Sequence, residues 1–131
     1  MKLFRAMIED ADGKPKVGPA AKKLGVRGLE NPDMQDVNVL LPTDLVMPGI
    51  GGMSVAPDDP FYLVAFLHTR SMGGNSPHPI WVIDESDLGS DLITVFDTTQ
   101  HRLICPVRPM TRMEFEAALA STRDRWLVYC R

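Results

Sequence analysis

The chain has 131 residues, 44% of them hydrophobic, which is enough for one ordinary domain that buries its core without disulfides or metals. Its 14 Lys and Arg residues are scattered among 17 Asp and Glu residues and give a formal net charge of −3. Charge alone would therefore hold no nucleic-acid backbone on any face, so we expect one domain over residues 1–131 and no nucleic-acid partner.

The sequence carries no recognisable export or membrane signal. MKLFRAMIEDADG (1–13) has a short apolar patch interrupted by Arg5 and followed by acids, which is not the pattern of a signal peptide. The longest apolar stretch, FYLVAFLH (61–68), is too short to span a bilayer. We expect a protein that is cytoplasmic when made and has no membrane partner, although a secretion machine that uses no cleavable signal could export it. Cys105 and Cys130 lack metal-binding spacing and are expected to be free thiols.

The first half of the chain predicts one strand and many loops. KLFRAMI (2–8) alternates as a strand, with Leu3, Arg5 and Met7 on one face. Prolines and glycines up to residue 50 exclude long helices, but allow one helical turn over Pro19–Leu24 and a short strand over DVNVLLP (36–42). A loop-rich stretch of this length is usually functional or mobile.

The middle of the chain predicts three short strands. FYLVAFLHTR (61–70) has no clean period and fits either a short helix or a buried strand. RSMGGNSPHP (70–79) has the composition of a flexible segment. Strands are predicted at IWVID (80–84), LITVFD (92–97) and HRLICPV (101–107), and TTQ suits a hairpin between the last two.

The last part of the chain predicts the main helix. Thr111 and Glu114 have capping-box spacing. The expected buried stripe is Phe115, Leu119, Thr122 and Trp126, and the expected solvent side is Arg112, Glu116, Arg123 and Asp124. LVYCR (127–131) fits either a frayed helix end or a terminal strand. The fold class is therefore α+β, mainly β with one main C-terminal helix.

Few residues stand out as candidates for chemistry. Arg5, inside an apolar strand, needs a partner, a water-filled cleft or an exposed sheet face. Ser54 follows Gly51 and Gly52, which either let a backbone or planar ligand approach closely or simply begin a bulged strand.

The histidines point to no common site. His68, His78 and His101 fall in different elements, so we expect no metal site. His101 begins the last of the three strands, and His68 with Arg70 ends the ambiguous segment; a lone histidine is more often structural than catalytic. No phosphate-binding loop, nucleophile elbow or dinucleotide fingerprint is present.

The order of these features resembles a known family. The chain resembles ADP-ribosyltransferase-like domains, whose layout has an arginine in the first strand, a Gly-Gly-x-Ser strand in the middle and a polar residue in a late strand. More closely, the chain resembles small cytotoxic effectors of bacterial type VI secretion that carry this fold and are paired with an immunity protein. The matching pieces are LFRAM (3–7), GGMSV (51–55), WVIDESDLGSDL (81–92) and HRLICPVRPM (101–110).

The resemblance implies an ADP-ribosyltransferase-like fold, with two small mainly antiparallel sheets forming a cleft for NAD, which is the substrate. It implies Arg5 at the phosphates or ribose and Ser54 at the nicotinamide end. The implied catalytic set is Arg5, Ser54 and His101, and the implied NAD-binding set is Arg5, Gly51, Gly52, Ser54, His68 and Arg70. Active transferases carry an acid in the late strand that stabilises positive charge on the ribose. HRLIC (101–105) has none, so His101 or a loop acid would have to serve.

The resemblance therefore implies a bacterial toxin that uses NAD to modify or deplete a cytoplasmic target and is neutralised by an immunity protein. On this hypothesis, Arg5→Ala abolishes toxicity while leaving the fold intact. The alternative is a non-enzymatic interaction domain that has kept the fold but lost the acid. A small RNA-acting toxin is disfavoured by the acidic balance.

Overall fold

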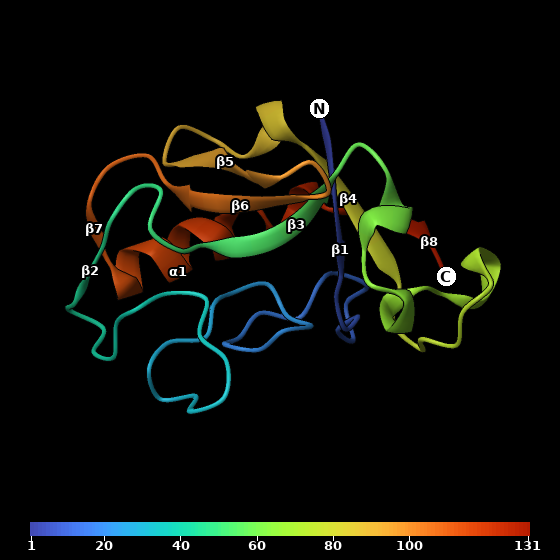
Figure 1. The fold of residues 1–131 in the computed structure, drawn as a ribbon, viewed down its shortest axis with the longest axis horizontal. Coiled ribbons are helices and arrows are strands. Elements are labelled where there is room, and N and C mark those ends of the chain that lie inside the picture. The colour runs from blue at the N-terminus through green and yellow to red at the C-terminus, as the bar shows by residue number, and fades with distance from the viewer.

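A computed structural model describes residues 1–131 as an α+β domain (Figure 1). One antiparallel sheet of six strands has the order β5-β6-β3-β1-β4-β8. Its strands are β1 (Lys2–Ala6), β3 (Met53–Pro57), β4 (Ile80–Asp84), β5 (Leu92–Thr98), β6 (His101–Pro106) and β8 (Leu127–Cys130). The remaining strands, β2 (Leu45–Val46) and β7 (Met110–Thr111), form a separate two-stranded sheet.

The helical elements are one α-helix and five short 3-10 turns. The α-helix is α1 (Arg112–Ser121). The 3-10 turns are η1 (Pro60–Tyr62), η2 (Ala65–Leu67), η3 (Arg70–Met72), η4 (Glu85–Asp87) and η5 (Arg123–Arg125). The ambiguous stretch at 61–70 is thus neither a strand nor an α-helix, since η1 and η2 close with i→i+3 bonds from Leu63 N to Pro60 O and from His68 N to Ala65 O.

The four strands predicted over residues 2–8, 80–84, 92–97 and 101–107 are confirmed, but they belong to one sheet. The resemblance implied two small sheets facing each other across a cleft. Instead, β3 pairs with β1 through Leu3↔Pro57 and with β6 through Met53↔Ile104. β3 therefore joins β5 and β6 on one side to β1, β4 and β8 on the other, and all six strands form one continuous sheet. The sequence left open whether residues 127–131 form a frayed helix end or a terminal strand. In the structure this segment forms the edge strand β8, paired with β4.

Two predicted elements are absent. Residues 19–24 do not form a helical turn, because the segment folds back and Leu24 N donates to Lys16 O. Residues 36–42 do not form a strand, because Asp36 N and Val37 N both donate to Arg27 O within a loop. The second segment has no neighbouring strand, and cross-strand pairing decides whether an extended segment becomes part of a sheet.

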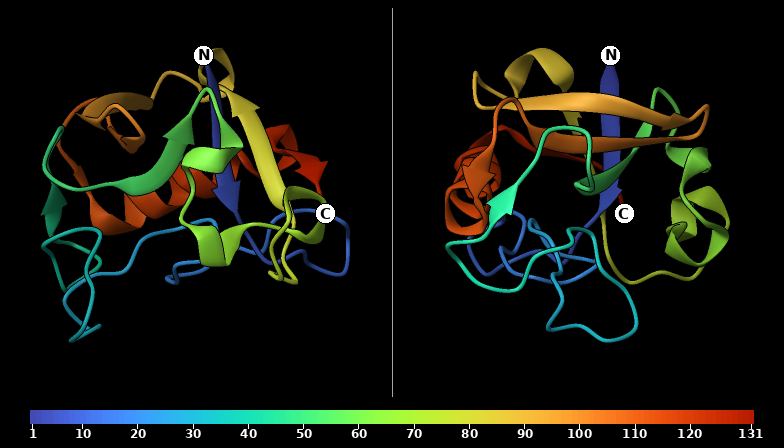
Figure 2. Two further views of the ribbon diagram at one scale, coloured as in Figure 1. Left: turned by 45° about the vertical axis from the view of Figure 1, so that its right-hand side comes forward. Right: turned by 60° about the vertical axis from the view of Figure 1, so that its left-hand side comes forward.

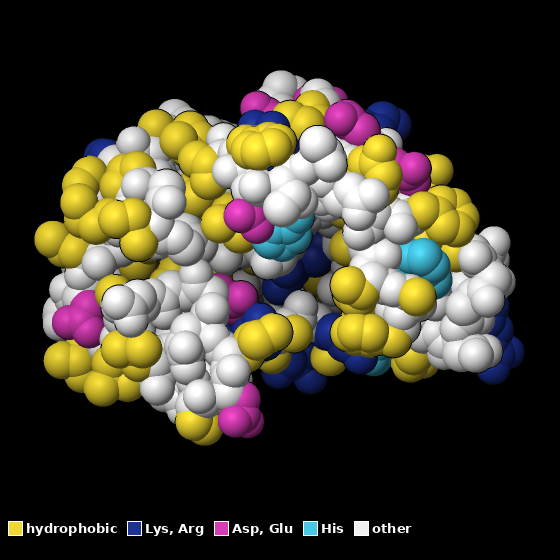
Figure 3. All heavy atoms as spheres, in the orientation of Figure 1, with side chains coloured by type: hydrophobic (Ala, Val, Ile, Leu, Met, Phe, Trp, Pro, Cys, Tyr) yellow, Lys and Arg dark blue, Asp and Glu magenta, His cyan; other side chains and the backbone are white.

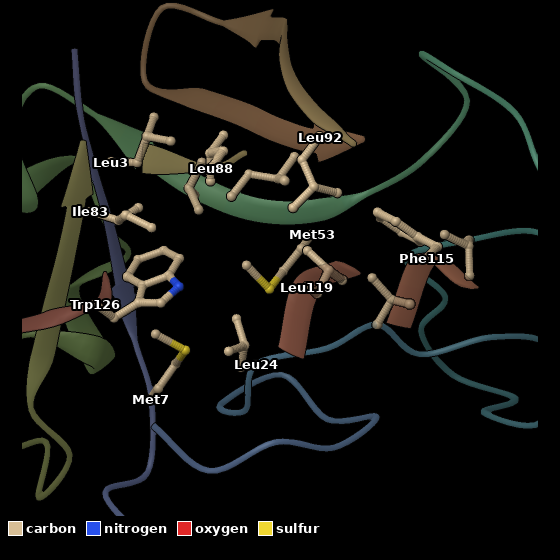
Figure 4. Close-up of a cluster of buried hydrophobic side chains, with 14 of the residues drawn as sticks. Leu3, Met7, Leu24, Met53, Ile83, Leu88, Leu92, Phe115, Leu119 and Trp126 are labelled. Carbon is tan, nitrogen blue, oxygen red and sulfur yellow. The ribbon is translucent and has the colours of Figure 1, made fainter. Parts of the chain in front are cut away.

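The main core lies between the sheet, α1 and the loop-rich segment 8–50 (Figure 4). The loop-rich segment contributes Leu24, Val26, Val37 and Val46, all buried. The Trp126 indole lies in the same core.

The start and the buried face of α1 are as predicted. The capping box of Thr111 and Glu114 forms. The expected stripe of Phe115, Leu119, Thr122 and Trp126 is buried, although its last two members follow the end of α1 at Ser121. The Trp126 indole donates to Thr122 Oγ1 at 2.9 Å, so these two residues continue the packed face beyond the helix.

The opposite face of the sheet carries a smaller core. Phe4, Ala6, Ala56 and Ile80 form it, covered by Leu63, Leu67 and Met72 of segment 60–76. Figure 2 shows this segment, in green, standing apart from the loop-rich segment, in blue and cyan. Both faces of the sheet are therefore covered in part by irregular chain. No helix in the structure has the length and apolar character needed to cross a bilayer.

Arginines hold much of the loop-rich segment. Arg112 was expected in solvent, and that prediction is wrong: it is buried, where it bonds to Glu30, Glu116 and the Leu40 carbonyl. Arg5 donates to Lys23 O, and Arg123 donates to Asp12 and to Pro15 O. Residues without regular structure are thus held by side-chain bonds that the sequence pattern does not display.

Candidate functional site

A cavity of about 350 Å³ opens on the face shown in Figure 3, where the surface is hollowed and dark-blue basic atoms lie inside the hollow. Its volume lies within the range of roughly 300–1,000 Å³ usual for ligand pockets. Four parts of the chain surround it: strands β1 and β3, segment 62–67, the loop-rich segment, and the β5–β6 hairpin. The lining residues are Arg5, Ala6, Ala21, Arg27, Met34, Ser54, Val55, Ala56, Tyr62, Leu63, Val64, Phe66, Leu67, Gln100 and His101.

The cavity exists because β1 and β3 separate. Their ladder pairs only Leu3↔Pro57 and Phe4↔Ala56. Beyond these pairs β1 continues its ladder with β4, up to Ala6↔Ile80. The carbonyl of Ser54 is therefore left without a β1 backbone partner, and a side chain takes over that role.

Arg5 fills this gap between the strands. Its Nη1 donates to Ser54 O at 2.7 Å, and its Nε and Nη2 donate to Lys23 O at 3.2 and 2.9 Å. These bonds use three of the five N–H groups of the guanidinium and leave one on each terminal nitrogen. Arg5 thus has both a structural role and a place in the cavity wall.

The charge of Arg5 is not matched by a direct acidic partner. Burial lowers the pKa of Arg5 to about 10, so the guanidinium stays charged at neutral pH. Asp36 is the acid that acts on Arg5 through its charge, but Asp36 forms its ion pair with Arg27. The cavity therefore has a positive floor that would favour an anionic group on a ligand.

Arg27 is a cavity residue that the sequence analysis missed. Its Nε and Nη2 donate to the two oxygens of Asp36, each at 2.9 Å, and Asp36 also accepts from the Arg27 amide. The side-chain hydrogen bonds to Asp36 raise the pKa of Arg27. An arginine nine residues before an aspartate in a loop has no sequence signature, so the pair could not have been found without the structure.

Ser54 faces the cavity because of the alternation of β3. Its neighbours Met53 and Val55 are buried in the main core, and Ser54 between them is half-buried on the opposite side. The bond from Arg5 uses the Ser54 carbonyl, so the hydroxyl stays free to meet a ligand. The structure thus brings Arg5 and Ser54 together at one cavity.

His101 joins them from the β5–β6 hairpin. It lines the cavity, and its Nδ1 lies 2.6 Å from Asp97 Oδ2. Figure 3 shows a histidine beside an acidic side chain at the rim of the hollow. Asp97 was not singled out from sequence, although its position four residues before His101 across a predicted hairpin was an available signal.

The mouth of the cavity is apolar and exposed. Phe66 is 74% exposed, Met34 59% and Val64 53%, and Tyr62 adds a half-exposed ring. Exposed aromatic and aliphatic side chains around a concave site are typical of surfaces that contact a ligand. Segment 62–67, which the sequence left open between a short helix and a buried strand, thus provides most of the apolar wall.

The remaining expected NAD-binding side chains do not line the cavity. His68 Nε2 bonds to Leu63 O at 2.7 Å, and its ring lies edge-on against Phe61. Arg70 is exposed on η3. These two residues lie on the same covering segment but outside the cavity wall.

Gly51 and Gly52 allow close approach of backbone. A Cβ at Gly51 would lie 2.3 Å from Asp36 O, and Gly51 has a φ of +78°. A Cβ at Gly52 would lie 2.4 Å from Ile104 O. The sequence suggested that either a backbone or a planar ligand approaches these glycines closely. In the structure it is protein backbone, and neither glycine lines the cavity.

The cavity wall offers cations, a hydroxyl, an imidazole and apolar groups, and none of its lining residues is acidic. No three His, Cys, Asp or Glu side chains gather as a metal site would require. Both cysteines are free, and burial raises the pKa of Cys105. No protein-family model, no curated protein and no solved structure matches the chain.

Proposed function

We propose that the chain is a toxin of the ADP-ribosyltransferase type that binds NAD in this cavity and cleaves it. One observation supports the proposal: Arg5, Ser54 and His101, taken from three strands as a catalytic set, all line the same cavity. The positive floor suits the pyrophosphate, and the apolar wall suits a planar ring. The proposal includes an ADP-ribosyltransferase-like fold, a target in the cytoplasm and a cognate immunity protein that neutralises the toxin.

Binding of NAD is tested by titration calorimetry. We expect saturable heat with the unmodified chain and about tenfold weaker binding for Ser54→Ala, because the variant loses a hydroxyl that faces the ligand. Ser90→Ala is the matched control, since Ser90 is exposed and lies outside the cavity. Absence of any NAD heat with the unmodified chain would rule out the proposal.

Cleavage and toxicity are tested separately. Incubation with NAD should release nicotinamide, measured by chromatography, and expression in bacterial cells should arrest growth unless the immunity protein is co-expressed. His101→Gln should lower both effects. Arg5→Ala is not a clean test, because it would leave the carbonyls of Lys23 and Ser54 without a donor and so weaken the fold.

A second candidate is a non-enzymatic interaction domain. Two observations favour it: the cavity wall and β6 contain no carboxylate, and a separate apolar surface is exposed over residues 40–50. The exposed side chains of that surface are Leu40, Leu41, Leu45, Met47 and Ile50. Capture of a protein partner from the native host, combined with no heat from NAD, would favour this candidate.

A further inference from the structure

We propose that Asp97 is a positioning residue that holds the His101 ring so that its Nε2 accepts a proton in the cavity. The inference rests on the proposed function and gives His101, the late-strand residue of that site, the role of a general base. It starts from one contact: Nδ1 of His101 lies 2.6 Å from Asp97 Oδ2.

The contact determines which nitrogen carries the proton. Asp97 is a carboxylate and can only accept, so the neutral His101 ring must donate its N–H from Nδ1. Nε2, on the other side of the ring, is then left with a lone pair. Because His101 lines the cavity and its Nδ1 is engaged by Asp97, Nε2 is the ring nitrogen left for a bound molecule.

The sheet places this histidine beside Ser54. Ser54 pairs with Leu103, so His101 is its diagonal neighbour on the same face, at about 7–8 Å between Cα atoms. Arg5 also lies at this end of the cavity, bonded to the Ser54 carbonyl. The cavity wall thus carries the Ser54 hydroxyl, the unprotonated Nε2 of His101 and the Arg5 cation. Asp97 is the acid that bonds to the His101 ring.

In the proposed reaction each group has a defined task. The bond between the ribose C1′ and the nicotinamide nitrogen breaks, and its electron pair leaves with nicotinamide. A lone pair of the acceptor, a hydroxyl of water or of the target, forms the new bond to C1′, and the acceptor's proton moves to Nε2 of His101. The imidazolium that results is stabilised by the Asp97 carboxylate until the proton passes to water.

Asp97 and His101 also contact each other across the β5–β6 hairpin, so their bond could serve only to hold the hairpin together. The test must separate this structural role from the positioning of the His101 ring. The first measurement is the tautomer of His101, read from the ¹⁵N shifts of labelled protein without ligand at a pH where the ring is neutral. We expect the proton on Nδ1 in the unmodified chain and a shift towards Nε2 in Asp97→Ala. Asp91→Asn is the control, because Asp91 binds Arg108 at a similarly exposed site away from the cavity.

The second measurement is the rate of nicotinamide release. Asp97→Ala should lower kcat about 100-fold or more with little change in KM, while Asp97→Asn, which can still accept from Nδ1 but carries no charge, should fall between Ala and the unmodified chain. A proton on Nε2 in the unmodified chain overturns the inference, as does an Asp97→Ala variant with unchanged kcat. If the unmodified chain releases no nicotinamide while Nδ1 carries the proton, the proposed function fails and the base role fails with it.

Discussion

The side chain of Arg5 replaces part of a β-ladder. It bonds to Ser54 O and Lys23 O where β1 and β3 separate, and so joins the sheet to the loop-rich segment. Removing its donors would leave two part-buried carbonyls without a partner, and each unsatisfied buried group costs about 1–3 kcal/mol. Arg5 therefore supports the cavity even where no ligand is bound.

We predict that Arg5→Met lowers the free energy of unfolding by about 3 kcal/mol, for the two carbonyls that lose their donor. Arg70→Met is the control, because Arg70 is exposed, and it should change stability by less than about 0.5 kcal/mol. Urea unfolding followed by circular dichroism measures both. Equal stability of Arg5→Met and the unmodified chain would contradict the structural role given to Arg5.

The backbone contact at Gly52 leads to a second prediction. A Cβ there would lie 2.4 Å from Ile104 O and 3.0 Å from Cys105 Sγ, so β3 and β6 would have to move apart. Gly52→Ala should lower the free energy of unfolding by about 2 kcal/mol, in the range of other overpacking substitutions.

Gly73→Ala is the comparison for Gly52→Ala. The added Cβ at Gly73 meets nothing within 4 Å, and only the φ of +91° is unfavourable. This substitution should therefore cost about 1 kcal/mol. Thermal unfolding of the two variants measures the difference, and a smaller cost at Gly52 than at Gly73 would show that β3 and β6 do not approach as closely as described.

Among the elements, α1 holds the loop-rich segment in part through one ion pair. Arg112 lies in the first turn of α1, its side chain is 8% exposed, and it bonds to both oxygens of Glu30. These hydrogen bonds lower the pKa of Glu30 from 4.5 to about 2. Since the Glu30 side chain is 42% exposed, solvent screens the pair, and its contribution is smaller than that of a fully buried pair.

The lowered pKa of Glu30 makes the stability of the fold depend on pH. A carboxylate whose pKa is lower in the folded chain stabilises the fold above its unfolded value, so this contribution is complete above about pH 4.5 and is lost as the pH falls towards about 2. Glu30→Gln should flatten the decline of unfolding free energy over this range. Acid titrations monitored by tryptophan fluorescence measure the slope; identical slopes for the two proteins would exclude a role for the pair.

Across the whole molecule, irregular chain forms much of the cover over the sheet. One face of the sheet packs against α1 and the loop-rich segment, and the other packs against segment 60–76 (Figure 2). The cavity lies where these coverings meet the β5–β6 hairpin. A site built between separate coverings can change its lining without changing the sheet.

If the loop-rich segment is part of the core, a single truncation in it should be as costly as one in a strand. Leu24 is fully buried although it lies in a loop, so Leu24→Ala should lower the unfolding free energy by about 3 kcal/mol. Leu29→Ala, at a leucine that is 46% exposed, should cost less than about 0.5 kcal/mol. Urea unfolding measures both, and equal effects of the two substitutions would show that the segment does not pack as described.

The sequence alone was sufficient for the elements whose signals are local. Alternation predicted β1, short strand-forming runs between turn residues predicted β4, β5 and β6, and the spacing of Thr111 and Glu114 predicted the start of α1. It also marked Arg5, Ser54 and His101 as unusual, and these three residues line one cavity. Such signals lie within a few residues, because backbone alternation and helix caps involve only near neighbours in the chain.

The partners of these residues became visible only in the folded chain. Arg5 meets Ser54 O across 49 positions, and Arg112 meets Glu30 across 82, so no local pattern could show that either arginine is satisfied inside the molecule. The joining of six strands into one sheet, and the burial of Leu24 in a loop, likewise depend on contacts between distant segments. Local sequence selects strands and caps, whereas the packing of remote segments decides which buried charges find partners and where a cavity remains.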